Sequence, residues 1–118
     1  MFWKTHFNMS DALVVLTNVA DVAAAELMAR QLVEQKLVAC VNILPGVRSI
    51  YRWQGVMEEA KEVTLMIKTS RSSYAQLEAS IKAIHPYQVP EIFALPIAVG
   101  LPAYLDWVMQ ECKKDSDV

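Results

Sequence analysis

Three prolines within residues 85–96, Pro86, Pro90 and Pro96, constrain the fold of this chain more than any other feature. Proline fixes φ and lacks a backbone N–H, and the residue before it favours an extended conformation. A helix that reaches this stretch must therefore end near His85, and an extended linker must follow it. His85 then lies at a helix C-terminus, where a ring nitrogen can point away from the helix, so we expect a functional site here.

The remaining sequence alternates between strand-like and helix-like segments. We expect four strands, in residues 12–17, 37–53, 59–69 and 91–97. We expect three helices, in residues 21–35, 70–84 and 100–112. The resulting β-α-β-β-α-β order with an added C-terminal helix predicts an α+β fold, a ferredoxin-like sandwich with a long central hairpin.

Each of the first two helices carries an apolar stripe that we expect to face the sheet. In the first helix the stripe consists of Ala24, Leu27, Met28 and Leu32. In the second helix it consists of Tyr74, Leu77, Ile81 and Ile84. Glu26, Arg30 and Glu34 follow one another at i,i+4 spacing and are interpreted as a solvent-facing row.

The central hairpin predicts a subunit interface. At about 3.3 Å per residue, residues 37–53 would extend past a layer of two helices. Pro45-Gly46 should interrupt the ladder as a bulge. Tyr51 and Trp53 near the tip would have no support in a monomer, and the hydrophobic fraction of 54% also suggests a covered surface. We therefore place both residues in a subunit interface.

Length and composition indicate the general class of protein. The chain has 118 residues, for which we expect one domain over 11–112 with tails at 1–10 and 113–118, and Met9 as an alternative start. A net charge of −2 predicts neither a nucleic-acid partner nor a membrane partner. Two cysteines and the lack of an apolar signal core in the first residues predict a cytoplasmic protein.

Cys40 and His85 form the only pair of soft ligands, suited to copper or another divalent cation. Both lie at the ends of predicted elements, so we expect them to converge at one end of the sheet, with Glu91 as an added oxygen ligand. Fewer than three strong ligands predict weak binding. In the alternative interpretation Cys40 is a small buried side chain, His85 caps a helix, and Glu91 forms an ion pair with Lys68 or Arg48.

The sequence shows no catalytic constellation. His85 is the only histidine beyond the N-terminal tail, no nucleophile motif accompanies it, and three scattered glycines form no phosphate loop. We therefore predict that the protein is not an enzyme. Arg48, Arg52 and Lys68 offer an alternative site for a small anionic ligand.

Several motifs, in order along the chain, resemble those of the CutA divalent-cation tolerance proteins. They are ACVNILPG at 39–46, SIYRWQG at 49–55, HPY at 85–87, PE at 90–91, LP at 95–96 and YLDW at 104–107. The resemblance extends over residues 12–108.

This resemblance implies a trimer of ferredoxin-like subunits, similar in architecture to the PII signalling proteins, with long hairpins that link neighbouring subunits. It also implies tolerance of copper and other divalent metals without an established enzymatic activity. Cys40 and His85 fall on family positions linked to copper, whereas Thr17 stands where some bacterial members have another cysteine. The alternatives are a PII-like regulator that binds an anionic ligand between subunits, and a trimeric scaffold that anchors a partner protein.

Overall fold

The computed structural model describes residues 11–112 and confirms the predicted α+β fold. The predicted tails, including Met9, lie outside the described residues. The four strands are β1 (Ala12–Val19), β2 (Cys40–Trp53), β3 (Val56–Ser70) and β4 (Ile92–Pro96). The helices are α2 (Val22–Glu34), α3 (Tyr74–Ile84) and α4 (Pro102–Glu111), with a short 3₁₀ turn, η1 (Arg71–Ser73), before α3.

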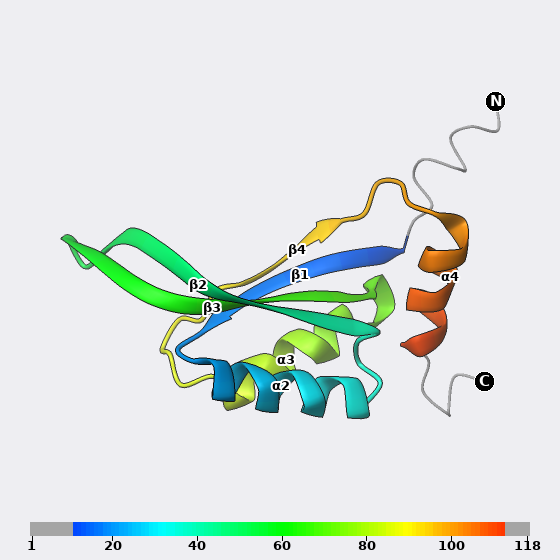
Figure 1. Ribbon diagram of the computed structural model, residues 1–118, viewed down its shortest axis with the longest axis horizontal. Coiled ribbons are helices and arrows are strands. Elements are labelled where there is room, and N and C mark those ends of the chain that lie inside the picture. The colour runs from blue at the N-terminus through cyan, green and yellow to red at the C-terminus, as the bar shows by residue number, and fades with distance from the viewer. Residues whose placement is uncertain (1–10, 113–118) are drawn as a thin grey trace.

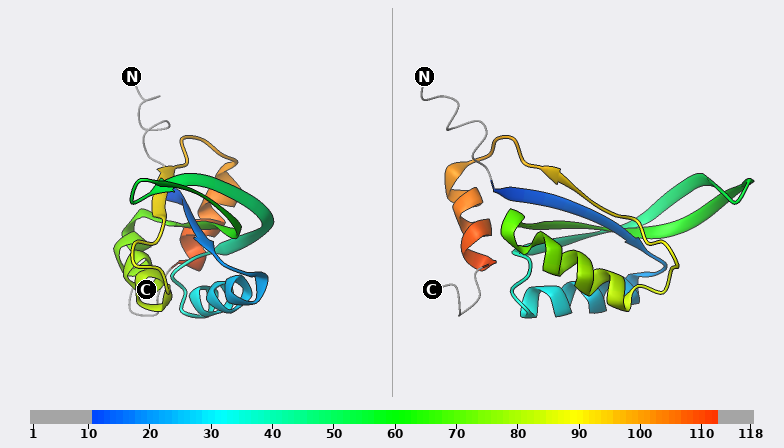
Figure 2. Two further views of the ribbon diagram at one scale, coloured as in Figure 1. Left: turned by 90° about the vertical axis from the view of Figure 1, so that its left-hand side faces the viewer. Right: turned by 180° about the vertical axis from the view of Figure 1, so that it is seen from behind.

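The strands form one antiparallel sheet in the order β2-β3-β1-β4. Helices α2 and α3 cover one face of this sheet, and α4 packs against its end beside the start of β1 (Figures 1 and 2). In the described part of the chain no helix covers the opposite face, which we call the open face of the sheet. Nor does any helix in residues 11–112 combine the length and apolarity that a membrane span requires.

The core lies between the sheet and the two covering helices, and it corrects the predicted face of the first helix. The buried residues of α2 are Ala25, Met28, Ala29 and Leu32, whereas Ala24 is exposed and Leu27 is 61% exposed. The small side chains of Ala25 and Ala29 lie on the sheet side, where they let the helix approach closely, and the larger Leu27 is turned outward.

The stripe predicted for α3 is confirmed at its centre. Leu77 and Ile81 are completely buried, Tyr74 is half-buried, and Ile84 in the last turn is 49% exposed. The backbone N–H of His85 bonds the carbonyl of Ile81, so the helix ends where the proline-rich stretch predicts.

The long hairpin and its bulge are also confirmed. The register between β2 and β3 shifts between Leu44 and Val47, and Gly46 has a φ of 78°, which glycine adopts without strain. Strand β1 pairs with β3 only as far as Val63, so the rest of the hairpin projects beyond the sheet (Figure 1). The return strand begins earlier than predicted, at Val56, because a turn of two residues with positive φ is enough to reverse the chain.

Candidate metal and ligand sites

Cys40 and His85 lie at opposite ends of the sheet, so the predicted convergence within one chain is wrong. Cys40 begins β2 directly opposite Lys68 of β3. The ring of His85 contacts the carbonyl of Asn18, and Asn18 pairs with Thr64 of β3. Lys68 and Thr64 are four positions apart in β3, which corresponds to roughly 13 Å along the strand. Position at the end of an element did not reveal which end of the sheet each residue occupies.

Three side chains lie near the thiol of Cys40 at one end of the sheet, and we call the four residues together the Cys40 corner: Cys40, Asn42, Lys68 and Tyr104. The ammonium of Lys68 lies 3.9 Å from the sulfur of Cys40 and donates a hydrogen bond to Oδ1 of Asn42. The same oxygen lies 4.0 Å from the Cys40 sulfur. Burial raises the pKa of Tyr104, and the nearby Cys40 adds to this effect. The corner therefore combines a soft donor with a positive charge.

The opposite cluster, which we call the His85 end, consists of Asn18, Glu62, Thr64, His85 and Tyr87. His85 is only 7% exposed, and its Nε2 lies 2.6 Å from the carbonyl oxygen of Asn18. Its Nδ1 accepts from the backbone N–H of Tyr87 at 3.3 Å. A carbonyl can only accept, so Nε2 carries the proton and both ring nitrogens are engaged. A metal ion could bind this ring only by displacing one of these bonds.

Two carboxylates, those of Glu62 and Glu91, lie at the same end of the sheet as His85. Glu62 accepts from the side-chain amide of Asn18 at 3.4 Å, and Thr64 donates to Oδ1 of the same amide at 2.6 Å. Burial raises the pKa of Tyr87, and the charge of Glu62 adds to it. Glu91 precedes β4, whose first residue pairs with Thr17 beside Asn18, so Glu91 and His85 share one end of the sheet.

The three predicted anion-binding residues do not share a site within the chain. Arg48 forms an ion pair with Glu59, at 2.8 Å from Nε and 2.6 Å from Nη2. Arg52 lies near the hairpin tip opposite Met57, and Lys68 lies in the Cys40 corner. The predicted ion pair of Glu91 with Lys68 or Arg48 is also wrong. Arg48 lies on the projecting hairpin beside Glu59, and Lys68 lies at the other end of the sheet.

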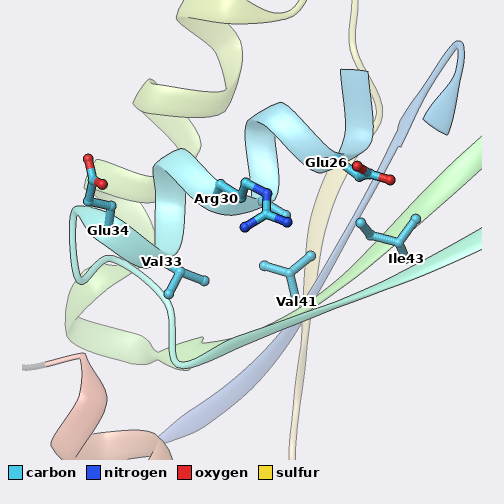
Figure 3. A pocket seen from close by; sticks show the side chains of 7 residues that line it. Glu26, Arg30, Val33, Glu34, Val41 and Ile43 are labelled. Carbon is cyan, nitrogen blue, oxygen red and sulfur yellow. The ribbon is translucent and has the colours of Figure 1, made fainter. Parts of the chain in front are cut away.

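A groove of about 610 Å³ runs between α2 and the edge strand β2 (Figure 3). Its lining consists of Glu26, Ala29, Arg30, Val33, Glu34, Val41 and Ile43. The charged row predicted to face solvent thus forms the rim of an apolar groove, because β2 lies alongside this face of the helix. The groove contains no thiol or imidazole and none of the predicted site residues.

Within one chain the donors fit a metal ion only incompletely. A structural zinc ion in a protein usually has four protein ligands. Residues 11–112 contain no group of three or more His, Cys, Asp or Glu side chains placed to hold an ion. Water or another chain would have to complete any coordination sphere.

Sequence reasoning missed the roles of Asn18, Asn42, Tyr87 and Tyr104 as neighbours of the predicted residues. One signal was available for Asn42. Alternate residues of a strand share a face, so Cys40 and Asn42 had to lie on the same side of β2. Tyr87 is only two residues from His85, so the local sequence also placed it there. Asn18 and Tyr104 come from elements distant in sequence, and no local pattern brings them to these sites.

Comparisons with known proteins point to one family. A family model described as CutA1 divalent ion tolerance protein matches residues 13–111. The divalent-cation tolerance protein CutA of Thermus thermophilus is 50% identical over 97 residues, which cover 82% of this chain and 94% of that protein. The crystal structure of CutA from Xylella fastidiosa superposes with a TM-score of 0.85 at 40% identity, and covers 88% of this chain and 100% of that one. A structure described as the periplasmic divalent cation tolerance protein CutA from Archaeoglobus fulgidus superposes with a TM-score of 0.83 at 35% identity, and covers 86% and 99% of the two chains.

Proposed function

The chain belongs to the CutA1 family of divalent ion tolerance proteins, and from this membership we propose that it acts as a non-enzymatic homotrimer that binds copper or another divalent cation. The observation that carries this proposal is the family match over residues 13–111, nearly the whole described chain. The names of the Thermus thermophilus and Pectobacterium atrosepticum relatives refer to tolerance of divalent cations and to no catalysed reaction.

Surfaces left uncovered in the single chain support the trimer. Tyr51 and Trp53 on the projecting hairpin are 45% and 44% exposed, and Phe93 and Leu95 on the open face are 41% and 49% exposed. Strands β2 and β4 are the edge strands of the sheet, and within residues 11–112 no further strand pairs with their outer sides. Exposed apolar edges of this length are usually covered, and head-to-tail contacts around a three-fold axis would cover all of these surfaces at once.

Light scattering after size-exclusion chromatography tests the trimer. We expect a mass three times the chain mass of 13.3 kDa. Trp53→Asp should lower that mass, because it buries a charge in the proposed interface. Leu27→Asp is the matched control, since Leu27 is exposed on α2, away from the hairpin. A monomer at micromolar concentration would contradict the proposal.

For metal binding we propose Cys40, His85 and Glu91 as ligands, at two separate places in each subunit. Cys40 offers a half-buried thiol at one end of the sheet, and His85 and Glu91 lie at the other. Cys40 and His85 can therefore hold the same ion only if they come from different subunits. Each place supplies too few donors for a complete shell, so binding should be weak and completed by water or a neighbouring subunit.

Calorimetric titration of Cu(II) and Zn(II) tests the three ligands. Cys40→Ser, His85→Ala and Glu91→Gln should each lower the affinity or the number of ions bound. Cys112→Ser is the matched control, because Cys112 is a thiol buried at the C-terminal end of α4 against Thr69. Circular dichroism must show that each variant is folded. If Cys40→Ser and His85→Ala bind metal as the parent does, the two residues are structural.

The alternative functions find less support. A PII-like anion site would use Arg48, Arg52 and Lys68, but Glu59 neutralises Arg48 and the three cations lie apart. A scaffold would need a partner surface, and no residue pattern identifies such a partner. Thermal shifts of one sample with metal ions and with nucleotides separate metal binding from anion binding, since each ligand stabilises the fold that binds it.

We propose the cytoplasm as the location. Cys40 and Cys112 are both free thiols, which suits a reducing compartment. The Archaeoglobus relative is described as periplasmic, so the periplasm is the location that the test compares with the cytoplasm. Cell fractionation with compartment markers decides between the two.

A further inference from the structure

The two faces of the projecting hairpin differ in charge. Successive side chains of a strand point to opposite faces, so the register of β2 with β3 assigns each hairpin residue to one face. The side chains of Glu62 and Asn18 meet on the open face of the sheet, and this face continues along the hairpin. It carries two carboxylates and no Lys or Arg, and we call it the acidic face: Tyr51, Trp53, Glu58 and Glu62.

The opposite face of the hairpin, which we call the basic face, carries three cations and one carboxylate. Its residues are Arg48, Ile50, Arg52, Met57, Glu59 and Lys61, and all six are exposed. Glu59 is already paired with Arg48, and in residues 11–112 no ion pair engages Arg52 or Lys61. A surplus of positive charge therefore projects from a chain whose net charge is −2.

The ladder sets the order of these side chains from the base of the hairpin to its tip. Arg48 lies opposite Lys61, Ile50 opposite Glu59, and Arg52 opposite Met57. Ile50 and Met57 are diagonal neighbours within reach of each other, and they are 65% and 71% exposed. Positive charge thus lies at both ends of an exposed apolar pair. The two ends are four positions apart in β2, which corresponds to roughly 13 Å.

The proposed trimer leaves the basic face free. The residues that we assign to subunit contacts lie on the acidic face and on the open face that continues it: Tyr51, Trp53, Phe93 and Leu95. On the other side, neither α2 nor α3 extends beneath the projecting hairpin (Figures 1 and 2). No sequence motif marks this surface, because the register that joins its two strands comes from the structure.

We propose that the basic face binds an extended acidic segment of a partner protein, in which two carboxylates flank an apolar side chain, as in Glu-x-Leu-x-Glu. Side chains on one face of an extended peptide repeat every two residues, so these carboxylates are also four positions and roughly 13 Å apart. One can reach Lys61 and the other Arg52, while the leucine packs between them. The basic face is only two strands wide, which suits one peptide segment better than a membrane or a nucleic-acid duplex. This activity goes beyond metal binding and does not depend on it.

Fluorescence anisotropy of a rhodamine-labelled peptide, Ser-Glu-Ser-Leu-Ser-Glu-Ser, tests the proposal with the full-length protein in metal-free buffer. We expect saturable binding that weakens as the salt concentration rises, because the Debye length falls from about 8 Å at physiological salt to about 3 Å at 1 M. The peptide Ser-Glu-Glu-Leu-Ser-Ser-Ser has the same composition but adjacent carboxylates. It should bind about 3-fold more weakly, since it engages only one end of the basic face.

Charge reversals at the two ends locate the binding surface. Arg52→Glu should weaken binding of the first peptide about 5-fold, because it replaces an attraction with a repulsion, and Lys61→Glu should do the same at the other end. Arg30→Glu is the matched control. It changes the net charge equally at an exposed position of α2 beside the groove, and it should leave the affinity unchanged.

The outcomes separate this proposal from the trimer. No binding at up to about 1 mM peptide, or equal binding by both hairpin variants and the parent, would show that the proposal is wrong. Binding of anionic phospholipid vesicles without binding of the peptide would also overturn it, in favour of a membrane surface. Should Arg52→Glu not fold, Lys61→Glu decides. If light scattering shows a monomer that still binds the peptide, the trimer is wrong and this inference stands.

Discussion

Replacing His85 with alanine should destabilise the fold by about 2–4 kcal/mol even without metal. The ring is 7% exposed, and its Nε2 donates to the carbonyl of Asn18 at 2.6 Å. Strand β4 begins opposite Thr17, so no residue of β4 pairs with Asn18, and the ring bonds the carbonyl of Asn18 instead. A buried carbonyl left without a partner costs about 1–3 kcal/mol, and the weaker bond from Tyr87 and the lost packing add about 1 kcal/mol.

His85→Gln is the matched control, because the amide nitrogen of glutamine extends about as far as Nε2 and can donate to the same carbonyl. It loses the acceptor for the N–H of Tyr87 and some ring packing. The expected loss is therefore about 1 kcal/mol, the typical net contribution of one hydrogen bond.

Urea unfolding followed by far-ultraviolet circular dichroism measures both values. All samples must have the same protein concentration, because the stability of an oligomer depends on it. With a slope of about 2 kcal/mol/M, alanine should lower the midpoint by about 1–2 M and glutamine by about 0.5 M. If alanine leaves the midpoint unchanged, or glutamine lowers it equally, the bond to Asn18 does not stabilise the fold. The same measurement shows whether a loss of metal binding in His85→Ala reflects a lost ligand or a weakened fold.

Three further variants probe the fold. Ile81→Ala should cost about 2–5 kcal/mol in urea unfolding, because Ile81 is completely buried, and a loss below 1 kcal/mol would contradict the described core. Gly46→Ala should lower the free energy of unfolding by about 1 kcal/mol in the same assay. No atom lies within 4 Å of the added Cβ, so the cost comes only from the φ of 78°. An unchanged midpoint would argue against this conformation. Burial and the hydrogen bond to Glu78 raise the pKa of Tyr74. The protonated phenol therefore stabilises the fold. This stabilisation is fully present below the unfolded pKa of about 10 and is lost as pH rises through the folded pKa. Tyr74→Phe should reduce the fall in melting temperature above pH 10, and an identical fall in both proteins would refute the assignment.

The sequence alone determined the order of the elements and several of their ends. The end of α3 at His85 follows from Pro86, the start of α2 follows from the capping side chain of Asp21, and the break in β2 follows from Pro45-Gly46. Each of these depends on the backbone preferences of one or two residues, so the local sequence suffices. The length of the hairpin likewise predicted exposed aromatic residues at its tip.

The face that α2 presents to the sheet was decided only by tertiary packing. The apolar residues of this helix extend more than half-way around it, and the sequence favoured a stripe with Leu27. Packing instead buries Ala25 and Ala29, since close approach of helix and sheet needs small side chains more than large ones. Tertiary packing likewise decided the partner of Arg48: the sequence offered Arg48 as an ion-pair partner for Glu91, whereas Glu59 lies beside it in the structure.

The composition of the candidate sites also depended on the tertiary structure, through strand register. Counted back from the pair Trp53 and Val56, an unbroken hairpin would place Cys40 opposite Thr69. The bulge sets two residues of β2 against one of β3, so Cys40 faces Lys68 instead. A shift of one residue moves a side chain to the other face of the sheet. The sequence showed where the ladder breaks, but only the pairing of β3 with both of its neighbours fixed the size of the register shift. That shift determines which charge lies beside Cys40 and how far this thiol lies from His85.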